Sequence, residues 1–112
     1  MRYASIDIGT NTLRLLVAEL DNDGLRPVFY KRKITRLGGG YDEVTGISRE
    51  AAERTFAALK EFRRHIDDAG VSTVLAFATS VVRRAKNSAW FTGEVRKKTG
   101  LEVTVIHGNE EA

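Results

Sequence analysis

The sequence predicts an α/β domain built on one mixed five-stranded sheet with flanking helices. Three observations lead to this fold class. Three strand-like runs joined by short polar turns open the chain, a long run at helical spacing follows, and two further strand-like runs each come after a helical segment. Strands joined by tight turns pair antiparallel, whereas a strand after a helical crossover pairs parallel. The predicted order is therefore βββαβαβ.

The first three strands are predicted over residues 3–8, 13–20 and 25–35. A small polar turn joins the first two, and Asp-Asn-Asp-Gly, typical of a tight hairpin, joins the second pair. Pro27 lies near the start of the third strand, a position that an edge strand tolerates. Three apolar residues of that strand are expected to share one face, and these are Val28, Tyr30 and Ile34.

The clearest helix begins after Ser48, a good N-cap, and ends at Gly70, a natural stop. Its apolar residues recur at helical spacing and predict one buried face, made of Ala52, Phe56, Leu59, Phe62 and Ile66. His65 has no second His or Cys at metal-ligand spacing. We therefore interpret His65 as a solvated residue of the helix surface.

Two later strands and one glycine-rich loop complete the framework. Residues 71–78 form an apolar run with few charges, typical of a central strand covered on both faces, and residues 101–106 form the last strand. Residues 36–46 contain three consecutive glycines and predict a loop, with Arg36 at its mouth. Such a loop is either a flexible connection or a cover for a ligand.

Two helical segments separate these later strands. The first is short and capped by Thr79 or Ser80, and the second is capped by Asn87 or Ser88 and ends at Gly100. The residues of the second segment that we expect to face inward are Trp90, Phe91 and Val95.

Composition is that of an ordinary globular domain, with 42% hydrophobic and 29% charged residues. No apolar run is long enough to span a bilayer and no leader pattern opens the chain, so we expect a cytoplasmic protein without a membrane partner. The absence of cysteine excludes disulfides and thiolate metal sites. With a net charge of +3 and no stacking aromatics between the basic residues, a small anion or polyanion is a better ligand than nucleic acid.

The first turn carries residue types that suit a phosphate group. Gly9 gives the backbone unusual freedom and leaves room for a ligand, and Thr10, Asn11 and Thr12 add hydroxyl, amide and main-chain donors. The turn matches neither the Walker A loop nor the Gly-x-Gly-x-x-Gly dinucleotide fingerprint. A plain hairpin tip built from the same residue types is the alternative.

Two charged residues flank this turn. Asp7 ends the first strand and could hold a divalent cation, because Mg²⁺ takes oxygen ligands and shares them with substrate phosphates. Arg14 is the odd charge in an apolar strand, so it either neutralises the same anion or points to solvent.

Two more polar features follow predicted strand ends, where ligands of open α/β sheets collect. One is the helix entry at Thr79 and Ser80, with Arg83 one turn further on. The other is the tail at residues 108–111.

Taken in this order, four motifs resemble the N-terminal part of the exopolyphosphatase and guanosine pentaphosphate phosphohydrolase (Ppx/GppA) family, a branch of the actin-like and sugar-kinase superfamily. They are D-I-G-T-N-T-x-R-L from Asp7, R-L-G from Arg36, A-T-S-x-x-R-x-A-x-N from Ala78 and G-N-E-E-A from Gly108. The first motif is shared with sugar kinases and actin-like ATPases, whereas the third and fourth motifs are more specific to the Ppx/GppA family. The resemblance implies an actin-like ATPase (ribonuclease H-like) half-domain.

The resemblance also implies roles for individual residues. Asp7 would help to place Mg²⁺ or another divalent cation, and Glu111, in preference to Glu110, would be the general base that activates water. The substrate would be inorganic polyphosphate or guanosine pentaphosphate, and the parent protein a homodimer. The implied phosphate-binding residues are Gly9, Thr10, Asn11, Thr12, Arg14, Thr79, Ser80 and Arg83.

The chemistry agrees with these roles, since phosphoanhydride hydrolysis needs positioning, charge neutralisation and an in-line water. Arginines and magnesium supply the first two, and a carboxylate beside the water supplies the third. Without the resemblance, the sequence favours a solvated acidic helix start for Glu110 and Glu111.

Two features depart from the family pattern. His107 stands where the family often has a small residue. The second phosphate loop of the family, Asp-Ile-Gly-Gly-Gly-Ser/Thr in type, has no match, because the glycines at 38–40 lack the preceding Asp-Ile. We therefore expect residues 1–112 to be an N-terminal fragment of the phosphatase domain that hydrolyses little by itself.

Two other functions stay open at this point. A kinase or ATPase of the same superfamily would use a similar first turn and would need an adenosine site elsewhere. A non-catalytic module that senses polyphosphate or nucleotides would bind its ligand without any dependence on Glu111.

Overall fold

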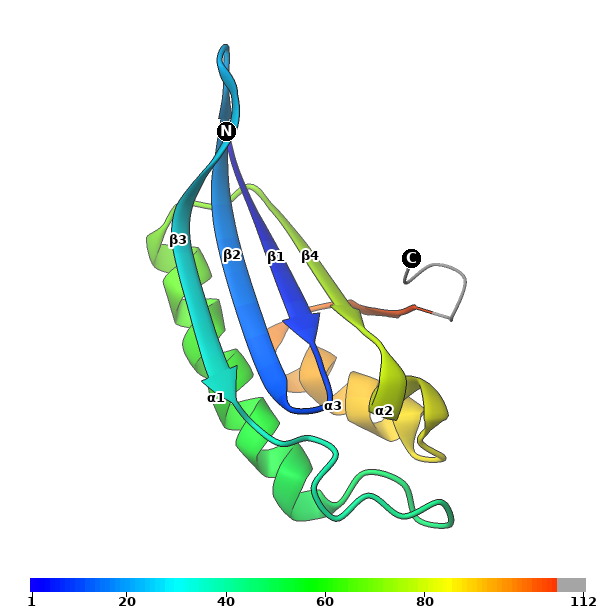
Figure 1. Ribbon diagram of the computed structural model, residues 1–112. Helices are drawn as coiled ribbons and strands as arrows, with labels where there is room; N and C mark the ends of the chain where they lie inside the picture. Colours follow the sequence, from blue (N-terminus) through cyan, green and yellow to red (C-terminus); the bar gives the residue numbers. More distant parts are fainter. Residues whose placement is uncertain (107–112) are drawn as a thin grey trace.

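The computed structural model describes residues 1–106, which form one sheet and three helices (Figure 1). In chain order the elements are β1 (Arg2–Ile8), β2 (Thr12–Asp21), β3 (Gly24–Ile34), α1 (Arg49–Asp68), β4 (Thr73–Ala78), α2 (Ser80–Arg84), α3 (Ser88–Thr99) and β5 (Val103–Val105). The strand order across the sheet is β3-β2-β1-β4-β5. The predicted α/β class and the five-stranded mixed sheet are confirmed, and α2 and α3 are the two helical segments that the single helix between the last strands in the predicted order βββαβαβ represents.

Strand directions follow the rule applied to the sequence. β1, β2 and β3 form an antiparallel meander, and the β2–β3 hairpin extends beyond the rest of the sheet (Figure 1). β4 runs parallel to β1 and β5 runs parallel to β4. The last strand is shorter than the predicted 101–106, because Leu101 is buried before the strand begins and Ile106 continues only through one bond from its N–H to the Ala78 carbonyl, 2.8 Å long.

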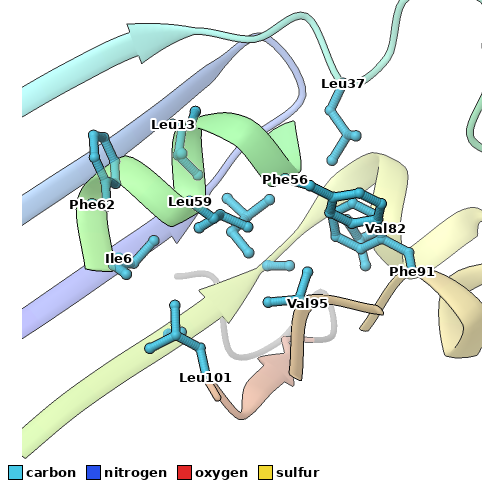
Figure 2. Close-up of a cluster of buried hydrophobic side chains, with 14 of the residues drawn as sticks. Ile6, Leu13, Leu37, Phe56, Leu59, Phe62, Val82, Phe91, Val95 and Leu101 are labelled. Atoms are coloured by element: carbon cyan, nitrogen blue, oxygen red, sulfur yellow. The ribbon is translucent and has the colours of Figure 1, made fainter. Parts of the chain in front are cut away.

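The core lies between one face of the sheet and the helices α1 and α3 (Figure 2). Alternate residues of β1 and β2, including Ile6 and Leu13, point toward this core, as strand geometry requires. The rings of Phe56 and Phe91 stack with centroids 5.4 Å apart and join α1 to α3. All five residues predicted for the buried face of the long helix are buried, as are Phe91 and Val95, whereas Trp90 is half-buried.

The opposite face of the sheet is open within the part of the chain that the structure describes. Leu75 of β4 is 56% exposed, so the prediction that residues 71–78 are covered on both faces is wrong here. Val28, Tyr30 and Ile34 are exposed too, at 43%, 56% and 67%. Their neighbour Phe29 packs inward instead, and the register of β3 shifts by one residue near Pro27. An apolar run alone does not say which face is buried, because a slip of one residue exchanges the two faces.

Helix ends are largely as predicted. The Ser48 hydroxyl caps α1 by accepting a hydrogen bond from the Ala51 N–H (3.2 Å). Gly100 ends α3 in the left-handed conformation, with φ of 74°. Among residues 1–106, no helix combines the length and apolar character that a membrane crossing requires.

Asn87 does not cap α3 with its side chain, contrary to prediction. Its Oδ1 accepts from the Ile47 N–H (2.9 Å) and its Nδ2 donates to the Ile47 carbonyl (3.0 Å). The side chain therefore pairs with the backbone of a segment 40 residues away. Gly46 is required beside it, because a Cβ there would collide with Asn87 Oδ1.

His65 lies on the helix surface as the sequence indicated but is only partly solvated, with 32% of its side chain exposed. Its ring packs on Phe29, with centroids 5.0 Å apart, and its Nε2 is buried without a hydrogen-bond partner in the described region. The sequence did not indicate this partial burial, because Phe29 comes from a strand far away in the sequence.

Glu61 links α1 to the edge strand β3. Its carboxylate pairs with Lys33 and, at 3.4 Å, with Lys31, and Nε2 of His65 lies 3.9 Å away. The hydrogen bond from Lys33 lowers the pKa of Glu61 below its usual 4.5, with Lys31 adding to the effect. A lowered carboxyl pKa stabilises the fold above the unfolded-state pKa, and this stabilisation is lost as the pH falls through the folded-state pKa.

We predict that Glu61→Gln lowers the free energy of unfolding at pH 7, and that the difference from wild type shrinks as the pH falls below about 4.5. Urea unfolding from pH 7 to pH 3 measures both. Glu53→Gln is the matched control, because Glu53 is an exposed glutamate of the same helix. A difference for Glu61→Gln that does not change with pH would contradict the prediction.

Candidate phosphate-binding site

The ends of β1 and β4 meet at one edge of the sheet. Ile8, the last residue of β1, lies beside Ala78, the last residue of β4, in parallel register. The Ile106 N–H donates to the Ala78 carbonyl, so the end of β5 reaches the same edge. The first turn and the entry of α2, predicted to follow strand ends, are therefore neighbours. The third predicted feature, residues 108–111, lies outside the described residues.

The first turn is tight, and glycine is required in it. The Gly9 N–H donates to the Thr12 carbonyl at 3.1 Å. A Cβ on Gly9 would stand 2.9 Å from that same carbonyl oxygen, closer than real Cβ contacts allow. Backbone approach, more than torsional freedom, is thus the reason for glycine here.

Residues 35–38, which follow β3, hold the turn through backbone hydrogen bonds. The Asn11 carbonyl accepts from the N–H groups of Thr35 and Arg36, both at 3.0 Å, and the Thr10 carbonyl accepts from Gly38 at 2.9 Å. The carbonyls thus point into the protein. The N–H groups of Thr10 and Asn11 donate to no protein acceptor within residues 1–106 and are available to an oxyanion.

Asp7 and Arg14 face each other across β1 and β2 on the open side of the sheet. Asp7 Oδ2 lies 3.9 Å from Arg14 Nη1, and both side chains are partly exposed. Arg14 therefore does not simply point to solvent. No cluster of three or more metal-ligating side chains occurs in the described region, so Asp7 belongs to no preformed metal cage there, although its carboxylate could contribute one ligand to a cation. One carboxylate together with substrate phosphates and water is a common way to hold Mg²⁺.

The entry of α2 is strained and polar. Ser80 has a φ of 41°, in the left-handed region that serine rarely adopts, at an expected cost of about 1–3 kcal/mol. Thr79 occupies the N-cap position without a side-chain capping bond, so the predicted capping role of its hydroxyl is wrong. Strained backbone of this kind clusters at ligand sites.

Arg83 joins α2 to the end of β5. Its Nη1 donates to the Ile106 carbonyl at 3.2 Å, and the side chain is partly buried. This bond places the guanidinium at the edge where the strands end. Part of its donor capacity is used by the protein itself.

Sequence reasoning missed one supporting residue. Arg54 of α1 donates from Nε to the Thr35 carbonyl (3.0 Å) and from Nη2 to the Arg36 carbonyl (3.1 Å). Arg54 thus fixes residues 35 and 36, and these residues bond to the first turn at the Asn11 carbonyl. Arg36, singled out as a loop-mouth residue, contributes through its backbone, with a φ of 50° and an exposed side chain. An arginine on the polar face of a helix gives no sequence signal of such a role.

Comparison with known proteins now identifies the family. The family model described as the Ppx/GppA phosphatase family matches residues 16–112. The chain belongs to the Ppx/GppA phosphatase family.

Relatives and solved structures agree with this assignment. The chain is 34% identical over 113 residues to exopolyphosphatase 1 of Mycobacterium tuberculosis, matching all of this chain and 33% of that protein. It is 36% identical over 116 residues to a bifunctional 3-dehydroquinate synthase/phosphatase of Fusobacterium nucleatum, of which it spans 18%. The structure of the Aquifex aeolicus Ppx/GppA enzyme superposes with a TM-score of 0.90 at 40% identity, covering 95% of this chain and 36% of that one. The chain thus spans a third or less of the curated relatives it matches.

The similarity also supports the actin-like fold class. An exopolyphosphatase from Cytophaga hutchinsonii gives a TM-score of 0.93 at 33% identity over 97% of this chain. The expected Ppx/GppA half-domain fold is therefore confirmed. The catalytic residue expected in such a phosphatase, Glu111, lies outside the described residues, as does His107.

We predict that Gly38→Ala weakens orthophosphate binding several-fold. A Cβ at position 38 would stand 2.6 Å from Thr10 Cγ2, so the Thr10 side chain must rotate or the turn must shift. Titration calorimetry with orthophosphate measures the effect.

Gly93→Ala is the control for this substitution. Position 93 lies in α3 with no atom within 4 Å of an added Cβ. Alanine there should leave binding unchanged and raise the free energy of unfolding by about 0.5–1 kcal/mol, because glycine is unfavourable inside a helix. Equal binding by Gly38→Ala and wild type would show that the orientation of Thr10 is unimportant.

Proposed function

We propose that this chain forms part of a phosphohydrolase that releases terminal orthophosphate from inorganic polyphosphate or guanosine pentaphosphate. The observation that carries the proposal is the meeting of the Gly9–Thr12 turn with the α2 entry and Arg83 at one sheet edge, in a member of the Ppx/GppA phosphatase family. The naming of several relatives as exopolyphosphatases supports the substrate class.

The turn binds the terminal phosphate through the outward N–H groups of Thr10 and Asn11 and through nearby hydroxyls, among them those of Thr12, Thr79 and Ser80. Arg14 and Arg83 add positive charge from two sides. Because these donors are held by the backbone bonds described above, they need little rearrangement as charge develops on the phosphoryl oxygens. Such preorganised electrostatic stabilisation is the main contribution that proteins make to phosphoryl transfer.

Asp7 fits a role in holding Mg²⁺ at this site, since its carboxylate is partly exposed at the end of β1. When bound, the ion would neutralise charge on the phosphate oxygens. The strand pairing of β1 with β2 places this carboxylate beside the turn, with Arg14 Nη1 3.9 Å away.

Glu111 is proposed as the general base that accepts a proton from the attacking water. It follows β5 by six residues, and β5 ends beside Ala78 at the edge that carries the turn. A base at this edge would address a phosphate held in the turn.

The chain alone is proposed to hydrolyse little. It spans 33% of the length of its exopolyphosphatase relatives, and the second phosphate loop that the family resemblance implies has no match in residues 1–112. Phosphate release by the 112-residue chain at a rate near that of the full-length gene product would refute this.

We predict that Glu111→Gln in the full-length gene product lowers kcat for magnesium-dependent phosphate release from long-chain polyphosphate by about 10²–10⁴-fold, the usual contribution of a general base. Substrate binding should persist, because the amide has the same shape as the carboxylate. Initial rates of phosphate release measure kcat, and equilibrium binding of polyphosphate tests the second expectation.

Glu110→Gln is the matched control and should stay within a few-fold of wild type. Equal activity of wild type and Glu111→Gln would remove Glu111 from the mechanism. Lack of phosphate release from both polyphosphate and guanosine pentaphosphate by the wild-type protein would contradict the proposed function.

A further inference from the structure

Two arginines lie directly opposite each other on the open face of the sheet. Arg14 of β2 pairs in register with Arg32 of β3, and Arg14 in turn pairs with Asp7 of β1. Asp7, Arg14 and Arg32 therefore form one row across three strands. Residues directly opposite in an antiparallel pair have Cβ atoms about 4.5–5.5 Å apart, and like charges in that position are destabilising.

The positive charge of this row is only partly balanced. Arg14 has Asp7 at 3.9 Å, but Arg32 is exposed and forms no ion pair within the described region. On the other face of β3 the positive charges are balanced, because Lys31 and Lys33 both pair with Glu61 of α1. β3 thus carries neutralised cations toward the helix and an unneutralised cation toward the open side.

The position of Arg32 relative to the turn is fixed by the backbone. Thr35 and Arg36, three and four residues beyond Arg32, donate to the Asn11 carbonyl. Arg14 follows Thr12 by two residues, or about 7 Å along the strand. An anion bound in the turn therefore lies next to Arg14 of β2. Arg32 lies beyond Arg14, on the neighbouring strand β3.

We propose that Arg32 and Arg14 together bind a second phosphate group of a phosphoanhydride chain whose terminal phosphate occupies the Gly9–Thr12 turn. This inference rests on the proposed function and extends it with a second phosphate position. A guanidinium presents a planar set of donors that suits phosphate oxygens. A row of two arginines relieves its mutual repulsion when an anion lies between them.

The test compares binding of orthophosphate and tripolyphosphate to the 112-residue chain by titration calorimetry in magnesium-free, low-salt buffer. Arg32→Ala should weaken tripolyphosphate binding about tenfold, which corresponds to roughly one charge-assisted contact. Orthophosphate binding should change less than about twofold, because a single phosphate in the turn does not reach β3.

Arg26→Ala is the matched control. Arg26 is also an exposed arginine of β3, but it pairs with Asp21 at the far end of the hairpin, about 20 Å from Arg32. This variant should bind both anions as wild type does. Equal loss of tripolyphosphate binding in Arg26→Ala and Arg32→Ala would mean that only net charge matters, and would overturn the proposal.

Gly38→Ala separates this inference from the function on which it rests. If Gly38→Ala weakens both anions and Arg32→Ala weakens neither, the turn binds phosphate and the second position is wrong. If the wild-type chain binds neither anion, the turn is not a phosphate site and both proposals fail.

Guanosine 5′-triphosphate in place of tripolyphosphate distinguishes two sources of the phosphoanhydride chain. A similar loss on Arg32→Ala with both ligands assigns the site to the phosphate chain itself. A loss with tripolyphosphate alone assigns it to inorganic polyphosphate, and a loss with the nucleotide alone would overturn the role proposed here for the bare chain.

Discussion

The candidate site depends on the hydrogen bonds that the Thr10 and Asn11 carbonyls accept from residues 35–38. A free hairpin tip could turn these carbonyls toward solvent, where they would repel a phosphate. Because the segment after β3 takes them, these carbonyls are directed into the protein, and the N–H groups of Thr10 and Asn11 keep no protein acceptor within residues 1–106. Arg54 of α1 secures that segment through the Thr35 and Arg36 carbonyls, so a helix that follows the turn by about 40 residues in sequence supports it.

The sheet supplies the second constraint, because it brings together strand ends that are far apart in sequence. The core residues under β1, β2 and β4 fix the sheet on α1 and α3, and the phosphate-site residues are placed at its edge or on its open face. Stability and chemistry are thereby assigned to opposite sides of the same strands. Asp7 is partly exposed on the open face, while its neighbours Ile6 and Ile8 are buried in the core.

Local signals in the sequence predicted the framework well, and contacts between distant segments account for the failures. The Ser48 cap, the Gly100 stop and the helical spacing that buries Phe56 and Phe62 depend on nearby residues, and all are present. The clamp of Asn87 on Ile47 and the packing of His65 on Phe29 depend on partners that no local pattern names. Neighbouring residues in the sequence likewise indicated Asp7 and the turn. No local pattern indicated that Arg54 supports the turn, because Arg54 lies on a helix far along the chain. The roles of Arg83 and Glu111 came from family resemblance, which is independent of local physics.

The parallel pairing of β1 with β4 has a kinetic consequence. The β1–β2–β3 meander and its turn are made of contacts between sequence neighbours, whereas Ile8 and Ala78 are about 70 residues apart. Closing so long a loop is entropically slower than forming hairpins. The donor-rich turn would therefore be in place before the α2 entry and Arg83 arrive, and the anion site would be completed only when β4 docks. A ligand that contacts both the turn and the α2 entry would then stabilise the contacts that form last. It would slow the opening of these contacts more than the opening of the β1–β2–β3 meander.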